Sequence, residues 1–278
     1  MSAPERIVVF TDLDGTLLDA ETYSFEGAQP ALQELRRRGI PLVACTSKTA
    51  PETRHFLARL ESDAPYIVES GAGIYLPRGW GEGLRPQDGL SKGSCRLSLA
   101  ADYAEVLEGM EEIRALTGGA VRGFHDMAPD EIAQRTGLPL ELATLAKGRE
   151  FDEPFLLLRE QPGWPSDLEA LARRRGLALT KGGRFWHLHG DTDKGRAVEV
   201  VKSLYRTPKG GLGTIGAGDS AMDLPLLQAV DVPVIVAKPG GEYDATLREK
   251  VPAAVLSGKP GPTGWSTGVL RALNVLNS

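Results

Sequence analysis

The sequence predicts an α/β fold in which a parallel sheet carries helices on both faces and a smaller α/β domain is inserted into the chain. Strand-like and helix-like segments alternate near both ends of the sequence, which is the pattern of βαβ units. The 278 residues also exceed the length of one average domain. We therefore predict a discontinuous core, residues 1–82 and 190–278, and a cap domain at 83–189.

The N-terminal half of the core opens with a strand at residues 7–10, which are wholly apolar and β-branched or aromatic. Such a run is typical of a strand buried on both faces of a parallel sheet. The turn signal DLDGT follows at 12–16. Apolar residues at helical spacing predict a helix at 28–38, which Gly39 ends. The remaining elements of this half continue the alternation: strand 41–45, helix 51–60 and strand 66–69.

The same alternation returns in the C-terminal part of the chain, so the sheet is split in sequence. The predicted helices there are 195–205, 221–230 and 269–276. The predicted strands are 211–218, 232–238 and a short one around Val255. Parallel sheets of this kind bind ligands at the carboxyl ends of their strands.

The inserted segment begins with frequent Gly and Pro between residues 77 and 93. The strands predicted within it are 95–100, 155–160, 177–183 and 184–189, and the helices are about 103–116 and 167–176. A cap that covers the ligand-binding edge of the core sheet is the economical arrangement of these elements.

Composition restricts the class of protein. Hydrophobic residues make up 41% and charged residues 25%, which argues against a disordered, collagen-like or coiled-coil chain. A net charge of −5 gives no broad attraction for nucleic acid or for an anionic membrane surface. No stretch approaches the roughly 20 apolar residues needed to cross a bilayer. We expect a small-molecule partner, with no nucleic acid and no membrane.

Cysteine usage bears on the compartment. Cys45 and Cys95 are too few for a disulfide framework, and neither belongs to a Cys/His cluster. The N-terminus leads directly into a strand-like run and leaves no room for a secretion signal. The sequence therefore predicts a cytoplasmic protein, as a monomer or a homodimer.

Two aspartates follow the first predicted strand directly, in Asp12-Leu13-Asp14-Gly15-Thr16. Carboxylates two residues apart repel each other in a dry pocket unless a cation neutralises them, and ligands that are all oxygen favour Mg²⁺. Asp12 is then placed to attack a phosphoryl group, and Asp14 to act as general acid and base. Taken alone, this motif is equally compatible with an acidic turn.

Two more junctions between a strand and a helix carry groups that suit a phosphate. Thr46, Ser47 and Lys48 follow the second strand and offer hydroxyl and amide donors, although such residues also begin helices. Lys194 precedes a predicted helix and can place a point charge near the phosphoryl oxygens, although a lone lysine more often lies on the surface.

A fourth junction adds acids. Asp219 and Asp223 follow the strand at 211–218 and can complete a cation site, whereas an acidic helix N-cap is the alternative for Asp219. Four such features at the same type of junction, in an order compatible with one sheet, favour a common catalytic site over four unrelated ones.

With DLDGT, Thr46, Lys194 and GDSAMD in this order, the sequence resembles the haloacid dehalogenase-like phosphatase superfamily along its whole length. The resemblance implies a Rossmann-like core, Mg²⁺ as cofactor and an aspartyl-phosphate intermediate. The catalytic residues it implies are Asp12, Asp14, Thr46 and Lys194. The metal-site residues it implies are Asp12, Asp14 through its main-chain carbonyl, Asp219, and Asp223 as a support.

Less generic segments, at 68–79, 136–155 and 182–197, are similar to the mannosyl-3-phosphoglycerate phosphatase family. That likeness implies hydrolysis of mannosyl-3-phosphoglycerate, or its glucosyl counterpart, in the synthesis of a compatible solute. Cationic groups are then expected at the substrate carboxylate and other groups at the sugar. The predicted substrate-binding residues are Ser47, Lys48, Glu69, Gly71, Arg149 and Arg184.

Two positions depart from the family pattern, because Ser70 and Met222 stand where its members usually carry Asn. We expect these changes to alter supporting hydrogen bonds rather than the reaction. His187 and His189 alternate along a predicted strand and are assigned no catalytic role.

Other functions remain open at this point. The same chemistry suits another sugar phosphate, such as sucrose phosphate, or a phosphomutase. A non-catalytic metabolite-binding protein on the same scaffold is a further alternative, but the intact pair Asp12 and Asp14 argues against it.

Overall fold

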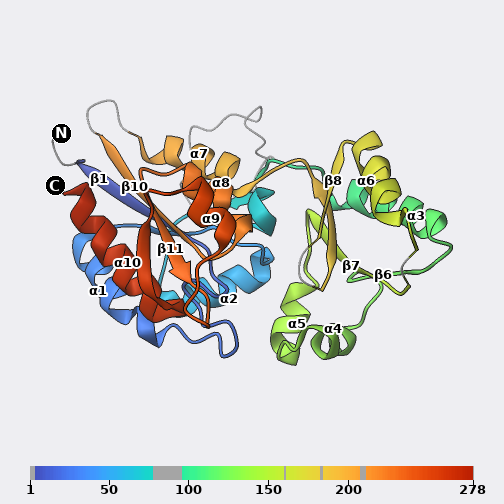
Figure 1. The fold of residues 1–278 in the computed structure, drawn as a ribbon, viewed down its shortest axis with the longest axis horizontal. Coiled ribbons are helices and arrows are strands. Elements are labelled where there is room, and N and C mark those ends of the chain that lie inside the picture. Colours follow the sequence, from blue (N-terminus) through green and yellow to red (C-terminus); the bar gives the residue numbers. More distant parts are fainter. Residues whose placement is uncertain (1–3, 78–95, 160, 182–183, 207–210, 278) are drawn as a thin grey trace.

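The computed structural model describes residues 4–77, 96–159, 161–181, 184–206 and 211–277. It confirms the α/β fold: a core built from both ends of the chain lies beside a separate lobe built from the middle (Figure 1). The predicted boundary between residues 82 and 83 and the predicted Cys95 strand start lie outside the described residues. Among the described helices, none combines the length and the apolar character that a membrane crossing requires.

The core sheet is parallel, with the strand order β12-β11-β10-β1-β2. The strand β1 pairs on one side with β10 and on the other with β2, so the N-terminal and C-terminal parts of the chain meet at its centre. The bounds are β1 (Arg6–Thr11), β2 (Leu42–Ala44), β10 (Leu212–Gly218), β11 (Val232–Ala237) and β12 (Val255–Pro260).

The strand predicted at 66–69 belongs to a separate small sheet and not to the parallel core sheet. Its residues form β3 (Tyr66–Val68), which pairs antiparallel with β4 (Gly73–Tyr75), and β4 pairs antiparallel with β5 (Arg96–Ser98). A single parallel bridge, Cys45 to Ile67, joins this small sheet to the core. The strand β5 thus belongs to the core side, although the prediction placed it in the cap.

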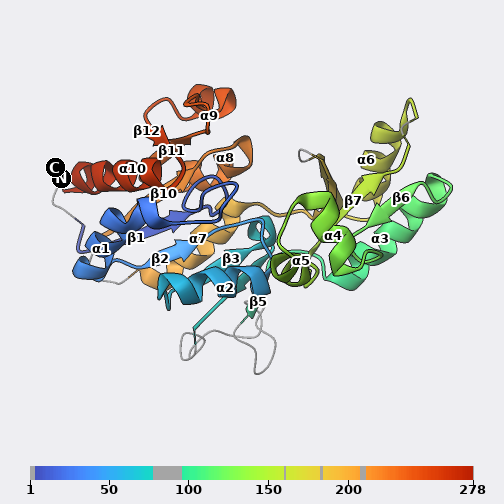
Figure 2. The ribbon, with the colours of Figure 1, turned by 90° about the horizontal axis from the view of Figure 1, so that it is seen from below.

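Helices cover both faces of the core sheet (Figure 2). One apolar cluster, with α1, α2 and α10, lies against one face, and a second, with α7 and α8, lies against the other. The bounds are α1 (Gln29–Arg38), α2 (Ala50–Leu60), α7 (Lys194–Tyr205), α8 (Leu224–Gln228), α9 (Ala245–Lys250) and α10 (Gly261–Leu276). Short 3-10 turns are η1 (Glu26–Ala28), η2 (Glu69–Gly71) and η4 (Ala221–Asp223).

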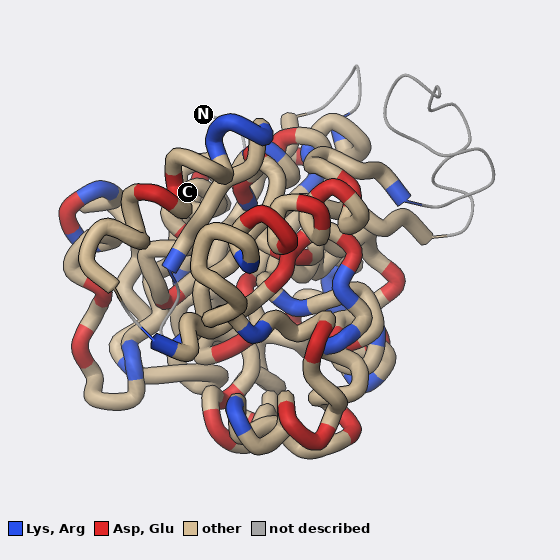
Figure 3. Tube along the Cα trace, turned by 90° about the vertical axis from the view of Figure 1, so that its right-hand side faces the viewer, with Lys and Arg blue, Asp and Glu red and all other residues tan. Residues whose placement is uncertain are grey.

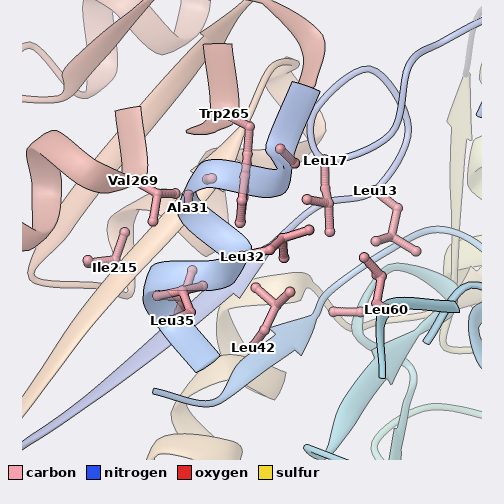
Figure 4. Close-up of a cluster of buried hydrophobic side chains, with 14 of the residues drawn as sticks. Leu13, Leu17, Ala31, Leu32, Leu35, Leu42, Leu60, Ile215, Trp265 and Val269 are labelled. Atoms are coloured by element: carbon pink, nitrogen blue, oxygen red, sulfur yellow. The ribbon is translucent and has the colours of Figure 1, made fainter. Parts of the chain in front are cut away.

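The larger apolar cluster fixes the last helix against the start of the chain. Trp265 and Val269 of α10 lie beside Ala31 of α1 (Figure 4), and all three side chains are fully buried. The helix α10 begins eight residues earlier than predicted, because Pro262 is accommodated in its first turn, where no backbone N–H is needed.

The cap is a four-stranded antiparallel sheet of order β6-β7-β9-β8 with helices α3 and α6 packed on one face. Its strands are β6 (Val121–Gly123), β7 (Asp152–Leu157), β8 (Leu177–Lys181) and β9 (Trp186–Gly190). Its helices are α3 (Tyr103–Leu116), α4 (Pro129–Thr136), α5 (Leu140–Ala146) and α6 (Trp164–Arg174). The elements β6, α4 and α5 were not predicted. Along this side of the molecule acidic and basic residues are interspersed (Figure 3).

The packing of α10 predicts a position-specific loss of stability. Leu273 is buried in the core cluster, whereas its neighbour Asn274 is exposed on the same helix. Leu273→Ala should lower the free energy of unfolding by about 2–5 kcal/mol, because apolar burial is lost and a cavity remains. The matched variant Asn274→Ala should change it by no more than about 0.5 kcal/mol. Urea denaturation measures both, and equal effects would contradict the packing of α10.

Candidate active site

Three of the four predicted motifs meet at one edge of the core sheet because they follow neighbouring strands. Asp12 comes directly after β1, Cys45 and Thr46 follow β2, and Asp219 follows β10. The register aligns the ends of these strands, with Thr11 opposite Ala217 on one side and Ala44 on the other. The carboxyl ends of all three strands therefore lie side by side, where such sheets bind ligands.

A chain of buried hydrogen bonds fixes the backbone at Asp12. Its N–H donates to Ala217 O at 2.9 Å, and the Thr11 hydroxyl donates to Asp12 O at 2.7 Å. The Thr11 hydroxyl in turn accepts the indole N–H of Trp265 at 2.9 Å. The helix α10 thus holds the strand end from which the Asp12 side chain projects.

The turn after Asp12 brings two motifs together. Gly15 has φ +73°, and a Cβ there would stand 3.2 Å from Asp219 Oδ2, so glycine suits both the conformation and the close approach. The next residue, Thr16, is fully buried and donates its hydroxyl to Asp219 Oδ1 at 2.7 Å. Gly15 and Thr16 of the DLDGT motif therefore hold Asp219 close to Asp12.

Lys194 lies between two carboxylates, which confirms that it reaches Asp12 and is not a surface lysine. The side chain is 3% exposed, and its Nζ donates to Asp12 Oδ1 at 2.7 Å and to Asp223 Oδ1 at 2.6 Å. Burial alone would lower the pKa of this amine, but the two carboxylates raise it above its usual value. Lys194 therefore stays positively charged.

Asp223 is held from both sides. Its Oδ1 accepts from Lys194, and its Oδ2 accepts from the backbone N–H groups of Asp219 and Ser220, both at 3.1 Å. These contacts make Asp223 a residue that positions Lys194 and the loop carrying Asp219.

Three carboxylates form a candidate cation site. Ligand atoms of Asp12, Asp219 and Asp223 lie within 4.8 Å of one another. Burial raises the pKa of Asp12 to about 8 and that of Asp219 to about 6, with neighbouring acids adding to the effect. The positive charge of Lys194 opposes these shifts only in part, so the buried carboxylates favour a further cation. A donor set made only of oxygen fits a hard divalent cation, so the residues present suit a metal.

The side chain of Asp14 is not part of this group of three carboxylates. Its Oδ2 forms an ion pair with Lys48 Nζ at 2.9 Å. Its buried Oδ1 has no hydrogen-bond partner among the described residues. The predicted role of its main-chain carbonyl at the metal stays a prediction. Lys48 is 5% exposed and also approaches Glu52 at 3.6 Å. Its contact with a substrate stays a prediction.

The loop after β2 is fixed by backbone contacts. Thr46 is fully buried, its N–H donates to Ile67 O at 3.1 Å, and its hydroxyl accepts the N–H of Lys48 at 3.2 Å. Thr49 caps the N-terminus of α2 in a capping box with Glu52, so the alternative reading of this segment as a helix start also holds. Contact of Thr46 and Ser47 with a phosphate stays a prediction.

Glu69 holds the start of the cap strand β7, and its contact with a sugar stays a prediction. Its carboxylate is 2% exposed and accepts backbone N–H groups at the start of β7, from Phe151 at 2.9 Å, Asp152 at 2.8 Å and Glu150 at 3.0 Å. Burial raises its pKa to about 7, against the opposing effect of Arg149. Glu69 therefore fastens the cap strand to the core.

The residues next to Glu69 also pack against the core. At Gly71, φ is +104° and a Cβ would stand 2.2 Å from Asp193 O, so glycine allows the loop to touch the start of α7. Its contact with a substrate stays a prediction. Ser70 has φ +59°, a region in which Asn is more easily accommodated. This explains why Asn is the more natural residue at that position.

The two predicted arginines lie in different surroundings. Arg149 donates Nη1 to Ser47 O at 3.1 Å and to Asp152 at 3.2 Å, and Nε to Ala146 O at 3.2 Å. Its side chain is 9% exposed, and its Nη1 joins the cap to the core through Ser47 O. Arg184, by contrast, is exposed two residues before β9 begins. Carboxylate binding by either residue stays a prediction.

A cavity of about 180 Å³ separates the cap from the core site. Its core wall includes Ser47, Lys194 and Met222, and Met222 is 49% exposed there. Its cap wall consists of side chains to which the sequence analysis gave no role: Asp152, Thr180, Lys181, His187 and His189. The alternation of the two histidines with Trp186 and Leu188 could have predicted their place, because alternate residues of a strand lie on opposite faces of the sheet. The histidines therefore lie on the face of the cap sheet that α3 and α6 do not cover.

Known proteins resemble this chain at the level of sequence and of fold. Residues 9–81 match the family model described as haloacid dehalogenase-like hydrolase. A glucosyl-3-phosphoglycerate/mannosyl-3-phosphoglycerate phosphatase of Persephonella marina is 39% identical over 270 residues, which cover 96% of this chain and 97% of that one. A protein of the same name from Methanococcoides burtonii is 38% identical over 274 residues, or 98% of each chain.

Among solved structures, a Thermoplasma acidophilum protein is similar with a TM-score of 0.67, covering 97% of this chain and 99% of that one. The sequence identity is 15%, so this likeness bears on the fold alone.

The ion pairs of Asp152 predict a pH-dependent contribution to stability. Burial would raise the pKa of this carboxyl, but His187 and Arg149 lower it below its usual 3.8. A depressed pKa in the folded state stabilises the fold above pH 3.8, and the contribution is lost as the pH falls below that value. Asp152→Asn should therefore cost about 3 kcal/mol at pH 7 and progressively less below pH 4.

Urea denaturation between pH 3 and pH 7 measures this difference, with the exposed Asp130→Asn as the control. A difference between Asp152→Asn and the unmodified protein that stays constant with pH would contradict the ion pairing.

Proposed function

The chain belongs to the glucosyl-3-phosphoglycerate/mannosyl-3-phosphoglycerate phosphatase family of haloacid dehalogenase-like hydrolases, and we propose that it hydrolyses one or both of these hexosyl-3-phosphoglycerates. The products are the free hexosylglycerate and inorganic phosphate. The observation that carries the reaction type is the Lys194 ammonium bonded to Asp12 beside two further carboxylates. The substrate class follows from relatives that match nearly the whole chain.

Asp12 is the nucleophile in this proposal. Its Oδ1 is engaged by Lys194, which leaves Oδ2 to attack phosphorus. The new bond between Oδ2 and phosphorus forms as the bond from phosphorus to the substrate oxygen breaks, so the phosphoryl group moves to Asp12. Lys194, Thr46 and Ser47 hold the phosphoryl oxygens, on which negative charge accumulates in the transition state.

Asp14 moves the proton. The buried Oδ1 atom, which has no hydrogen-bond partner within the described part of the chain, is the site from which a proton passes to the departing alkoxide. Asp14 then takes a proton from the water that attacks the aspartyl-phosphate, and inorganic phosphate leaves as Asp12 is restored. Lys48, paired with Oδ2, keeps this carboxyl in place through both steps.

The cation is Mg²⁺ in this proposal, held by Asp12, Asp219 and the main-chain carbonyl of Asp14, with Asp223 as their support. When bound, it supplies positive charge that neutralises the clustered carboxylates and the phosphoryl oxygens. Protein oxygen ligands that are few and partly supplied by loops suit Mg²⁺, which keeps several of its waters.

Phosphate release from purified protein tests the substrate and the metal together. With Mg²⁺, mannosyl-3-phosphoglycerate or glucosyl-3-phosphoglycerate should give the highest kcat/KM in a panel that includes sucrose 6-phosphate. EDTA should abolish this activity and added Mg²⁺ should restore it. Without a cation, the clustered carboxylates repel the negatively charged phosphate of the substrate. A preference for sucrose 6-phosphate would contradict the proposed substrate. Transfer of the phosphoryl group within the organic molecule, without release of inorganic phosphate, would contradict hydrolysis. Full activity in EDTA would contradict the role of the metal.

The nucleophile is tested by Asp12→Asn, which keeps the size of the side chain and removes its charge. This variant should lose at least about 1,000-fold in kcat, because no covalent intermediate can form. Acid-quenched protein should carry labelled phosphate in the unmodified enzyme and none in the variant. The surface variant Asp130→Asn should match the unmodified enzyme. Labelled acyl-phosphate on Asp12→Asn would assign the nucleophile to another residue.

A further inference from the structure

The cap turns a polar sheet face toward the core, and the mechanism above does not use it. In β9, Trp186 and Leu188 are buried in the apolar cluster under α3 and α6, so His187 and His189 lie on the opposite face. His187 stands across from Thr180 of β8 and Pro154 of β7. His187 and Thr180 both line the cavity between the cap and the core.

The same face closes the cavity above the catalytic residues. Lys194 lines the core wall, and His187, Thr180 and Asp152 line the cap wall. Because Lys194 bonds directly to Asp12, the phosphoryl end of a substrate lies at the core wall. The remainder of the substrate therefore extends toward His187 and its neighbours.

Asp152 fixes the orientation of His187. The imidazole Nδ1 lies 2.9 Å from one oxygen of this carboxylate and 3.2 Å from the other. Asp152 is buried and also accepts from Arg149, and its pKa is lowered, so it is ionised and can only accept. Nδ1 must then carry the hydrogen, and in the neutral ring Nε2 is an acceptor. Within the described residues Nε2 has no hydrogen-bond partner.

Two neighbouring side chains already have partners within the protein. His189 uses both ring nitrogens inside the cap, Nδ1 with Gly190 O at 2.8 Å and Nε2 with the Thr180 hydroxyl at 3.3 Å. Arg149 is committed to Ser47, Ala146 and Asp152. When the ring carries only the hydrogen on Nδ1, His187 Nε2 is thus an acceptor that the cap wall leaves to a ligand, and an acceptor matches a hydroxyl rather than a carboxylate.

We propose that His187 is a specificity-determining residue that accepts a hydrogen bond from a hydroxyl of the substrate's sugar, with Asp152 as its positioning partner. The inference rests on the proposed function for the identity of the sugar. A buried hydrogen bond of this kind separates substrates by at least tenfold, because the site's acceptor is left unpaired when the hydroxyl is missing.

The test compares His187→Phe, which keeps a ring and removes both nitrogens, with the matched variant His125→Phe at an exposed histidine of the same domain. The quantity measured is the ratio of kcat/KM for the preferred hexosyl-3-phosphoglycerate to kcat/KM for p-nitrophenyl phosphate. His187→Phe should lower this ratio at least tenfold, and His125→Phe should leave it unchanged. Thermal melting establishes that both variants are folded.

A substrate without the sugar separates the two groups that His187 might recognise. 3-Phosphoglycerate keeps the carboxylate and lacks the hexose, so its kcat/KM relative to p-nitrophenyl phosphate should not fall in His187→Phe. An equal fall for 3-phosphoglycerate and the hexosylated substrate would overturn the assignment to the sugar. A ratio within twofold of the unmodified enzyme for all substrates would overturn the proposal as a whole.

The positioning role of Asp152 is tested by a double-variant cycle. Asp152→Asn should lower the same ratio when His187 is present and should have no further effect in the His187→Phe background. A general structural role would lower the ratio equally in both backgrounds and would overturn the assignment of Asp152.

The unmodified enzyme alone tests the proposed function, so the two failures are distinguishable. If it hydrolyses a hexosyl-3-phosphoglycerate and the ratio is unchanged in His187→Phe, this inference alone fails. If it prefers another sugar phosphate, the proposed substrate fails and the ratio is measured with that sugar phosphate. If its preferred substrate carries no sugar, both fail.

Discussion

The buried ammonium of Lys194 between Asp12 and Asp223 is the interaction on which the rest of the site depends. Three charged groups, one positive and two negative, share a space with almost no access to water. Each would be costly to bury alone, so they are stable only together. One negative charge remains in excess and Asp219 adds another, which is why the cluster favours a divalent cation. The same arrangement leaves one oxygen of Asp12 for chemistry. The charges of these side chains thus determine both the stability of the cluster and the reactivity of Asp12.

This balance requires the chain to bring distant residues together, and the parallel sheet does so. Because β1 lies between β10 and β2, residues at positions 12, 46 and 219 leave the sheet at adjacent strand ends. The helix α7 delivers Lys194 to the same edge, and α10 fixes Asp12 through Trp265 and Thr11. The apolar clusters on both faces hold these helices in place. The position of each polar group is therefore set by packing that is remote from it.

The cap is joined to this edge by more than its two chain crossings. Glu69 gathers three backbone N–H groups at the start of β7, Arg149 reaches Ser47 O, and Thr49 donates to Leu145 O at 3.0 Å. The loop that carries Glu69 also touches Thr46 through Ser70 and the start of α7 through Gly71. One short loop thereby contacts the phosphate segment, the helix of Lys194 and the cap. These contacts hold the cap side of the cavity in a defined position relative to the catalytic groups.

The sequence by itself determined the fold class, the split core and the catalytic motifs, because each leaves a local mark. Alternating apolar runs mark strands and helices, and Asp12, Thr46, Lys194 and Asp219 each stand at a strand or helix boundary. Tertiary structure decided what the other polar residues do. Glu69, Lys48 and Arg149 all suit a ligand by type, and the packed fold also gives each of them a partner far along the chain. His187 suited a surface position by type, yet the face on which it lies and its bond to Asp152 turn it toward the cavity. A residue's type limits which bonds it can make, and only the packed fold decides which partners are within reach.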